Sequence, residues 1–148
     1  MIFLISEIPL ENSDLKSELL DNKAGGFVCF EGWVRDFNEN KEVLMLEYEA
    51  YSAMAKSEAE KIFLEAKEKF KLLDVKCIHR VGKLKVGEIA IWLGVTSIHR
   101  GPAFEACEYI IDNIKTRLPI WKKEYYKDGD SGWVNCDECA KHIEKTKV

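Results

Sequence analysis

Hydrophobic residues along the chain follow two different periods, which predict helices and strands in alternation. In two segments, about residues 52–70 and 102–118, apolar residues recur every three or four positions, as on one face of an amphipathic helix. Shorter segments rich in β-branched and aromatic residues predict strands. These predicted strands cover residues 1–8, 27–34, 43–51, 75–81, 89–96 and 120–126.

The order of these elements predicts an α+β fold, with helices packed on one side of a mostly antiparallel sheet. Ser13 is a typical helix-capping residue, and the leucines that follow it indicate a further short helix. Polar residues between strands 27–34 and 43–51 predict a hairpin, and a second hairpin is expected between strands 75–81 and 89–96.

Length and composition indicate one globular domain covering residues 1–148, with a polar tail at 135–148. No repeat, low-complexity tract or linker divides the chain. The formal net charge of −4 argues against a broad nucleic-acid-binding surface. No apolar run approaches the roughly 18 residues that a membrane span needs, and the N-terminus lacks the features of a signal peptide.

The cysteines indicate a reducing compartment. The chain has five, an odd number, and Cys29, Cys77 and Cys107 stand alone within apolar segments, where small core residues are expected. Reduced thiols of this kind predict a cytoplasmic location and no disulfide framework.

Two polar motifs are interpreted as structural. Cys136, Cys139 and His142 are spaced like metal ligands, but a structural zinc site needs four ligands and no second cysteine pair is present. A thiol-bearing surface tail is therefore favoured over a zinc or redox site, and no metal is expected. His79 and Arg80 are adjacent in a predicted strand, so one is expected to point inward and the other outward.

Basic residues at the ends of predicted elements are the first candidates for a binding site. Arg35 directly follows a strand, and His99 and Arg100 lie between a strand and the second long helix. Backbone N–H groups at a helix start, beside an arginine, favour an anion such as phosphate. Taken one at a time, each residue is better explained as a solvated or hydrogen-bonded loop residue, although strand-to-helix loops are where sites concentrate.

Lys115 lies at the margin of an apolar helical stripe. At 100° per residue it projects about 20° from Phe104 and about 40° from Ile111. The stripe consists of Phe104, Cys107, Ile111, Ile114 and Leu118. Spacing favours a lysine whose stem covers the core edge while its ammonium reaches water. The alternative is a partly desolvated amine that acts as an acid, base or nucleophile.

Positive charge is concentrated around this lysine. Residues 115–127 contain Arg117 and four lysines against the single acid Glu124. Such a local reversal in an acidic protein suggests a pocket for an anionic ligand. Strand alternation puts Lys122 on the same face as Glu124 and Lys123 on the opposite face, so only one of these two lysines can face a given pocket.

The chain resembles the large, catalytic subunits of molybdopterin synthase. The resemblance runs in order from about residue 25 to residue 134, through GFVCFEGWVRDFN, VLMLEYEAY with the following MA, HRVGKLKVGE, VTSIHRGPAFEAC, IDNIKTRLPIWKKE and DGDSGWV. No single segment is decisive, but the ordered set is specific. The family's α/β hammerhead-type fold is consistent with the α+β prediction.

The resemblance implies a sulfurtransferase of molybdenum-cofactor biosynthesis. A homodimer would bind two copies of a small ubiquitin-like carrier subunit, giving a heterotetramer. The thiocarboxylate at the carrier's C-terminus would supply sulfur to cyclic pyranopterin monophosphate, forming the molybdopterin dithiolene without a bound cofactor. Matched to the family's motifs, Lys115 and Lys122 would be catalytic. These two lysines, with Arg35, His99 and Arg100, would bind the substrate.

Two departures from the family pattern bear on the site. The stretch after Trp133, VNCDEC, is acidic where the family tends to place a basic residue that reaches the neighbouring subunit's site, and Lys141 is a candidate replacement. Phe37 and Asn40 stand where relatives often have histidine and glycine, and asparagine tolerates the left-handed backbone of a turn. The alternative function is a non-catalytic module that binds a ubiquitin-like tail or another anionic ligand.

Overall fold

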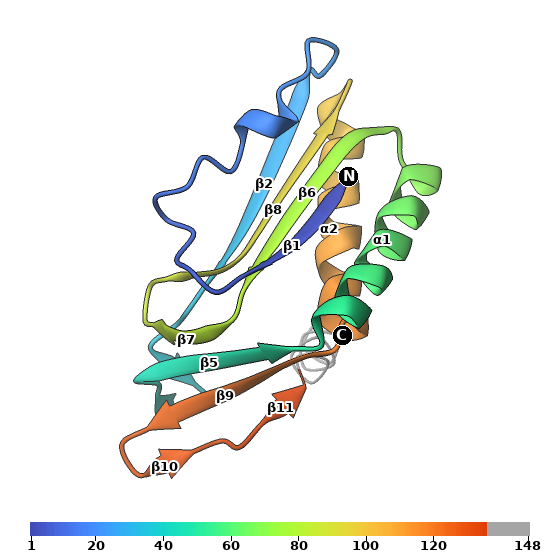
Figure 1. Cartoon of the computed structure of the whole chain (residues 1–148). Helices are drawn as coiled ribbons and strands as arrows, with labels where there is room; N and C mark the ends of the chain where they lie inside the picture. The colour runs from blue at the N-terminus through green and yellow to red at the C-terminus, as the bar shows by residue number, and fades with distance from the viewer. Residues whose placement is uncertain (136–148) are drawn as a thin grey trace.

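The computed structural model describes residues 1–135 and has an α+β architecture, as the sequence predicted. Two long helices pack against one sheet, and a second sheet lies at one end of this layer pair (Figure 1). Neither helix, nor any other within residues 1–135, is long and apolar enough to cross a membrane.

The first sheet contains four strands in the order β1-β6-β8-β2. Of its two inner strands, β8 is buried along its entire length because both faces of the sheet are covered. Strand β1 is parallel to β6, and the other neighbours are antiparallel. The strands are β1 (Ile2–Ser6), β2 (Gly26–Trp33), β6 (Leu72–Arg80) and β8 (Ile89–Ser97).

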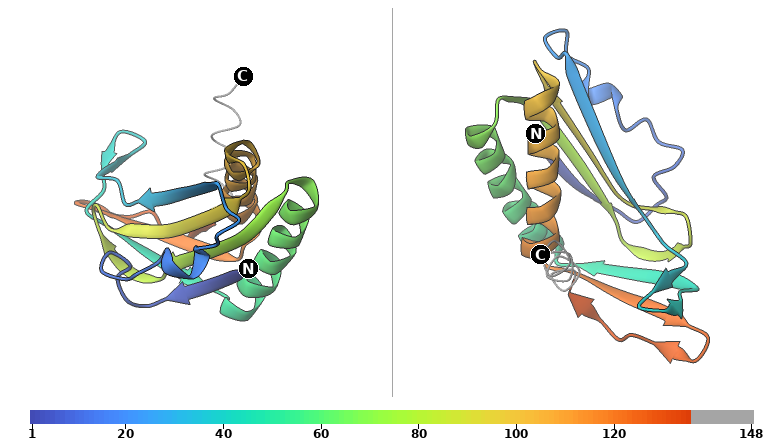
Figure 2. Two further views of the ribbon diagram at one scale, coloured as in Figure 1. Left: turned by 90° about the horizontal axis from the view of Figure 1, so that it is seen from above. Right: turned by 180° about the vertical axis from the view of Figure 1, so that it is seen from behind.

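The helices α1 (Ser52–Lys69) and α2 (Arg100–Arg117) cover one face of this sheet (Figure 2). On α1 the predicted apolar face is buried: Ala55, Ala59, Ile62, Phe63 and Ala66. On α2 the predicted stripe was partly wrong, since Phe104 is 60% exposed. The helix instead packs through Ala103, Ala106, Cys107, Ile110 and Ile114, whose small members allow it close to the sheet.

The other face of the first sheet is covered by the segment between β1 and β2. The helix expected after Ser13 is only a 3₁₀ turn, η1 (Ser17–Leu19). Leu19 packs with Trp92 in a second apolar cluster, and Gly94 makes room for both. A Cβ on Gly94 would lie 2.5 Å from the Trp92 ring and 2.6 Å from a Leu19 methyl group.

The second sheet is antiparallel in the order β10-β9-β5-β7, with β11 also paired to β9. The chain that follows α2 enters this sheet as β9, so the basic segment 115–127 runs from the end of that helix into the sheet (Figure 1). Its strands are β5 (Met45–Ala50), β7 (Gly82–Lys85), β9 (Ile120–Tyr126), β10 (Gly129–Asp130) and β11 (Val134–Asn135).

One of the two predicted hairpins is wrong. Strand β2 pairs with β8, whereas β5 pairs with β7 and β9 in the other sheet. The polar stretch between β2 and β5 forms its own small hairpin from β3 (Phe37–Asn38) and β4 (Lys41–Glu42). Its turn residues Glu39 and Asn40 have φ of 49° and 64°, the left-handed conformation that asparagine tolerates. The hairpin of β6 and β8 is confirmed, with β7 in its loop.

The prediction for the core cysteines is confirmed for two of the three. Cys77 and Cys107 are buried between α2 and the first sheet. Cys29 is exposed and lies on β2, an edge strand of that sheet. Cys136, Cys139, Lys141 and His142 lie outside the described residues.

Candidate functional site

Lys115 lies in the last turn of α2 and is half-buried. Its charge acts on two buried groups of β6: burial raises the pKa of Cys77 and lowers that of His79, and the Lys115 ammonium exerts a smaller lowering effect on both. Among residues 1–135 it makes no hydrogen bond or ion pair. Lys115 is therefore an amine at the edge of the core, next to uncharged partners and without a carboxylate from the described chain.

Of the two buried groups that the Lys115 charge affects, His79 is the imidazole. It is 2% exposed, and its Nδ1 lies 2.8 Å from the carbonyl oxygen of Arg80. Because a carbonyl only accepts, Nδ1 carries the hydrogen and Nε2 keeps a lone pair. Burial, with a further contribution from Lys115, lowers the His79 pKa to about 3, so the imidazole is neutral at pH 7.

The sequence did not predict that His79 and Arg80 are both buried. Arg80 is 7% exposed and donates from Nη1 to Glu88 Oε2 at 3.3 Å. The two side chains leave the strand on opposite faces, but β6 is covered on both faces, so alternation no longer separates an inner residue from an outer one.

Lys122 lies in the middle of β9, directly opposite Tyr48 of β5. Its Nζ is 3.3 Å from Oε1 of Glu124, and both side chains are largely buried. The same carboxylate accepts hydrogen bonds from Asn38 Nδ2 at 2.9 Å and from the Tyr126 hydroxyl at 2.7 Å. Burial first, and then the bond to Glu124, raises the Tyr126 pKa to about 12.

Lys123 points away from Lys122, as strand alternation predicted. Its Nζ lies 4.9 Å from the centre of the Trp133 ring and 5.8 Å from that of Tyr125. The adjacent lysines thus have different surroundings: a buried carboxylate for Lys122 and half-exposed aromatic rings for Lys123.

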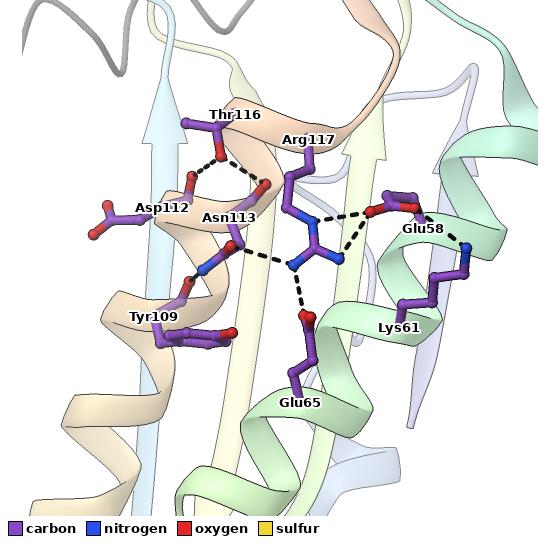
Figure 3. Close-up of polar contacts among 8 residues, drawn as sticks. All are labelled: Glu58, Lys61, Glu65, Tyr109, Asp112, Asn113, Thr116 and Arg117. Atoms are coloured by element: carbon purple, nitrogen blue, oxygen red, sulfur yellow. Dashed lines mark hydrogen bonds and ion pairs between the residues drawn. The ribbon is translucent and has the colours of Figure 1, made fainter.

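Arg117 joins the end of α2 to α1, a role that the sequence analysis missed (Figure 3). Its Nε donates to Glu58 at 2.9 Å, and its Nη1 donates to Glu65 at 2.5 Å and to Asn113 at 3.4 Å. The two carboxylates raise the Arg117 pKa, with the Glu65 bond as the largest cause. Arg117 is thus held by α1, which fixes the turn that carries Lys115. The spacing of Glu58 and Glu65, two helical turns apart on α1, was the available signal.

His99 and Arg100 lie at the opposite end of α2 from Lys115. Both are exposed, and His99 makes no side-chain capping hydrogen bond. Gly26 packs against this helix start, where a Cβ would lie 3.0 Å from Arg100 Cα. With a rise of 1.5 Å per residue, the 15 residues from Arg100 to Lys115 place their backbones about 22 Å apart.

Arg35 lies at the lysine end of the molecule. Strand β2 begins at Gly26, beside Arg100, and its seven steps to Trp33 span about 24 Å. Arg35 follows that far end, with its guanidinium 5.7 Å from the Phe37 ring. The next residues connect to β9 through the Asn38–Glu124 hydrogen bond. One chain therefore brings Arg35, Lys115 and Lys122 to one end and leaves His99 and Arg100 at the other.

No group of three histidine, cysteine or acidic side chains within residues 1–135 is arranged to hold a metal ion. The site chemistry available to the described chain is that of amines, guanidinium groups and a neutral imidazole. These groups suit an anionic ligand and proton transfer.

Comparisons with known proteins agree on one family. The family model described as MoaE protein matches residues 5–117, a range that includes Arg35, His99, Arg100 and Lys115 but ends before Lys122. The molybdopterin synthase catalytic subunit of Thermoplasma volcanium is 40% identical over 129 residues, 87% of this chain and 94% of that protein.

Solved structures support the same assignment. Molybdopterin synthase from Staphylococcus aureus superposes with a TM-score of 0.81 at 34% identity, over 90% of this chain and 95% of that one. A complex of subunits 1 and 2 of molybdopterin-converting factor from Helicobacter pylori matches with a TM-score of 0.73 at 25% identity, over 88% of each chain. This chain belongs to the MoaE protein family of molybdopterin synthase catalytic subunits.

Proposed function

We propose that this chain is a sulfurtransferase that converts cyclic pyranopterin monophosphate into the molybdopterin dithiolene. The sulfur would come from the C-terminal thiocarboxylate of a small ubiquitin-like carrier subunit. The family assignment supports the reaction. The two-subunit complex from Helicobacter pylori supports a second subunit. Since the carrier brings the sulfur, no cysteine of this chain is needed as a nucleophile.

The half-buried amine of Lys115 is the observation that carries this proposal. It has no carboxylate partner among the described residues, so its charge and its protons remain available to a bound anion. In the reaction it would act as a general acid or base, or stabilise the negative charge that develops as sulfur is transferred. Low exposure strengthens either effect, because less water screens the charge.

Lys122 would bind the carrier's anionic terminus or the pterin. Its ion pair with Glu124 holds the ammonium in one place, since both side chains are largely buried. A fixed ammonium binds an anion without first losing the rotamer freedom of an exposed lysine. Lys123 on the opposite face has no such role.

His99 and Arg100 would bind the substrate phosphate from a neighbouring subunit. The backbones of Lys115 and Arg100 are separated by about 22 Å along α2, so a pterin phosphate would reach both residues of one chain only if both side chains extended along the helix. In a homodimer, a two-fold axis that crosses α2 pairs it with an antiparallel copy. That arrangement places His99 and Arg100 of one subunit beside Arg35, Lys115 and Lys122 of the other.

The direct test mixes the chain with thiocarboxylated carrier and cyclic pyranopterin monophosphate and follows dithiolene formation. We expect Lys115→Ala to lower turnover by about 10²- to 10⁴-fold, the usual contribution of a general acid or base. Lys123→Ala is the matched control and should retain turnover. A folded Lys115→Ala protein with normal turnover would overturn the proposed role. Carrier binding without any turnover by the unaltered chain would instead indicate a binding module.

A further inference from the structure

Two buried polar aromatic residues lie between the proposed catalytic lysines and have no role in the chemistry described above. Tyr48 is 6% exposed and His79 is 2% exposed. Their ring centres are 4.9 Å apart, and the rings meet edge to face at 71°. Such pairs prefer this T-shaped geometry, which fixes both the distance and the orientation of the rings.

The Tyr48–His79 contact joins the two sheets. Tyr48 belongs to β5 of the second sheet, where it is the direct cross-strand partner of Lys122. His79 belongs to β6 of the first sheet, on the face against which α2 packs, and it is near enough to Lys115 for the two groups to interact electrostatically. Strand pairing, a ring contact and an electrostatic interaction therefore connect Lys122, Tyr48, His79 and Lys115 in that order.

The hydrogen bond of His79 gives it one orientation and one tautomer. Nδ1–H donates to the Arg80 carbonyl at 2.8 Å, which leaves the Nε2 lone pair for the other side of the ring. A neutral imidazole with a free lone pair tolerates an ammonium beside it. A protonated imidazole would place a second positive charge there and push the lysine away.

We propose that His79 and Tyr48 are positioning residues that hold Lys115 in its productive place relative to Lys122. His79 would act through its neutral Nε2, and Tyr48 would fix the His79 ring from the second sheet. This inference rests on the function proposed above, because it assigns Lys115 the central chemical role. Neither residue would contact the substrate.

Three variants test the functional part. Replacing His79 by phenylalanine keeps a ring but removes both nitrogens, whereas His79→Gln keeps a polar group near the position of Nε2. Tyr48→Leu removes the ring that supports His79. A displacement of about 1 Å can cost up to about 100-fold in rate, so we expect kcat to fall roughly 10- to 100-fold in His79→Phe and Tyr48→Leu. The KM values should stay nearly unchanged, and His79→Gln should recover part of the loss.

The matched control is Lys76→Met. Lys76 lies on the same strand, is 3% exposed and has its ammonium 3.5 Å from Glu18 on the η1 side of the sheet. Replacing it perturbs a buried residue of β6 as strongly, but away from Lys115, so kcat should not change. Equal loss in Lys76→Met and His79→Phe would mean that the effect is general destabilisation, and would overturn the inference.

Nitrogen-15 NMR tests the electrostatic interaction between His79 and Lys115 without any activity measurement. In the unaltered protein we expect the His79 ring to be neutral and protonated at Nδ1 from pH 8 to pH 5, and His79→Gln to shift the Lys115 amine signal but not that of Lys123. A His79 ring protonated at pH 6, or an unshifted Lys115 signal, would refute the positioning role. An inactive unaltered chain that passes both NMR tests would refute the proposed function but not the interaction between His79 and Lys115.

Discussion

Acidification should lower the free energy of unfolding, because the buried His79 stays neutral while the same residue is protonated in the unfolded chain. The imidazole has a pKa of about 3 in the folded protein and an ordinary value of 6.5 when exposed. Between these values the unfolded chain binds a proton at His79 and the folded chain does not. The stability conferred by a neutral His79 is therefore complete above pH 6.5 and is lost progressively as the pH falls towards 3.

The magnitude follows from the pKa difference. In the unfolded chain the imidazole has its ordinary pKa of 6.5, and pH 5 lies 1.5 units below that value. At about 1.4 kcal/mol per unit, this stabilises the unfolded state by about 2 kcal/mol relative to pH 7.5. In His79→Phe this contribution is absent. From pH 7.5 to pH 5 the unaltered protein should therefore lose about 2 kcal/mol more of its unfolding free energy than the variant does.

Urea denaturation at the two pH values measures this difference, with the protein concentration held constant because an oligomer's stability depends on it. Cys77→Ala is the matched control. Cys77 is two residues away on the same face of β6, and burial raises its pKa, so the thiol is neutral at both pH values. Its effect on stability should be the same at pH 5 and pH 7.5. A His79→Phe difference that is likewise independent of pH would refute the buried, neutral state of this imidazole.

Three further predictions concern other parts of the site. Arg117→Met leaves Glu58 and Glu65 without their shared partner, and a loss of about 1 kcal/mol is expected in denaturation experiments. Gly26→Ala forces a Cβ against the backbone of Arg100, so the KM for the pterin precursor should rise, whereas at Gly101 no atom lies within 4 Å of a new Cβ and Gly101→Ala should leave KM unchanged. Simultaneous replacement of the two tail cysteines, 136 and 139, by serine should leave turnover intact, and its loss would indicate a thiol or metal role.

Much of the fold could be predicted from periodicity because each element buries its own apolar face. The face of α1 is an example, since its alanines, Ile62 and Phe63 recur at helical spacing and are all buried. Strand pairing was less predictable, because it depends on distant segments. Adjacency in sequence suggested that β2 and β5 form a hairpin, but their apolar faces belong to different sheets.

The candidate site also has features that could be predicted from the sequence and features that could not. The opposite orientations of Lys122 and Lys123 follow from strand alternation alone. The buried state of His79 does not, because it depends on Tyr48 from another sheet and on α2 above it. The bonds from Arg117 to Glu58 and Glu65 also join residues 59 and 52 positions apart. From the sequence alone, only their opposite charges indicate that these residues pair.

Complementation between two inactive variants shows whether each active site combines Lys115 of one subunit with Arg100 of its neighbour. Lys115→Ala and Arg100→Ala chains carrying different tags would be co-expressed, and the mixed dimer purified through both tags. In that dimer a shared site would have either both alterations or neither, so we expect about half of the unaltered turnover. Turnover as low as that of the parent variants would place both residues in one subunit's site and refute a site shared between subunits.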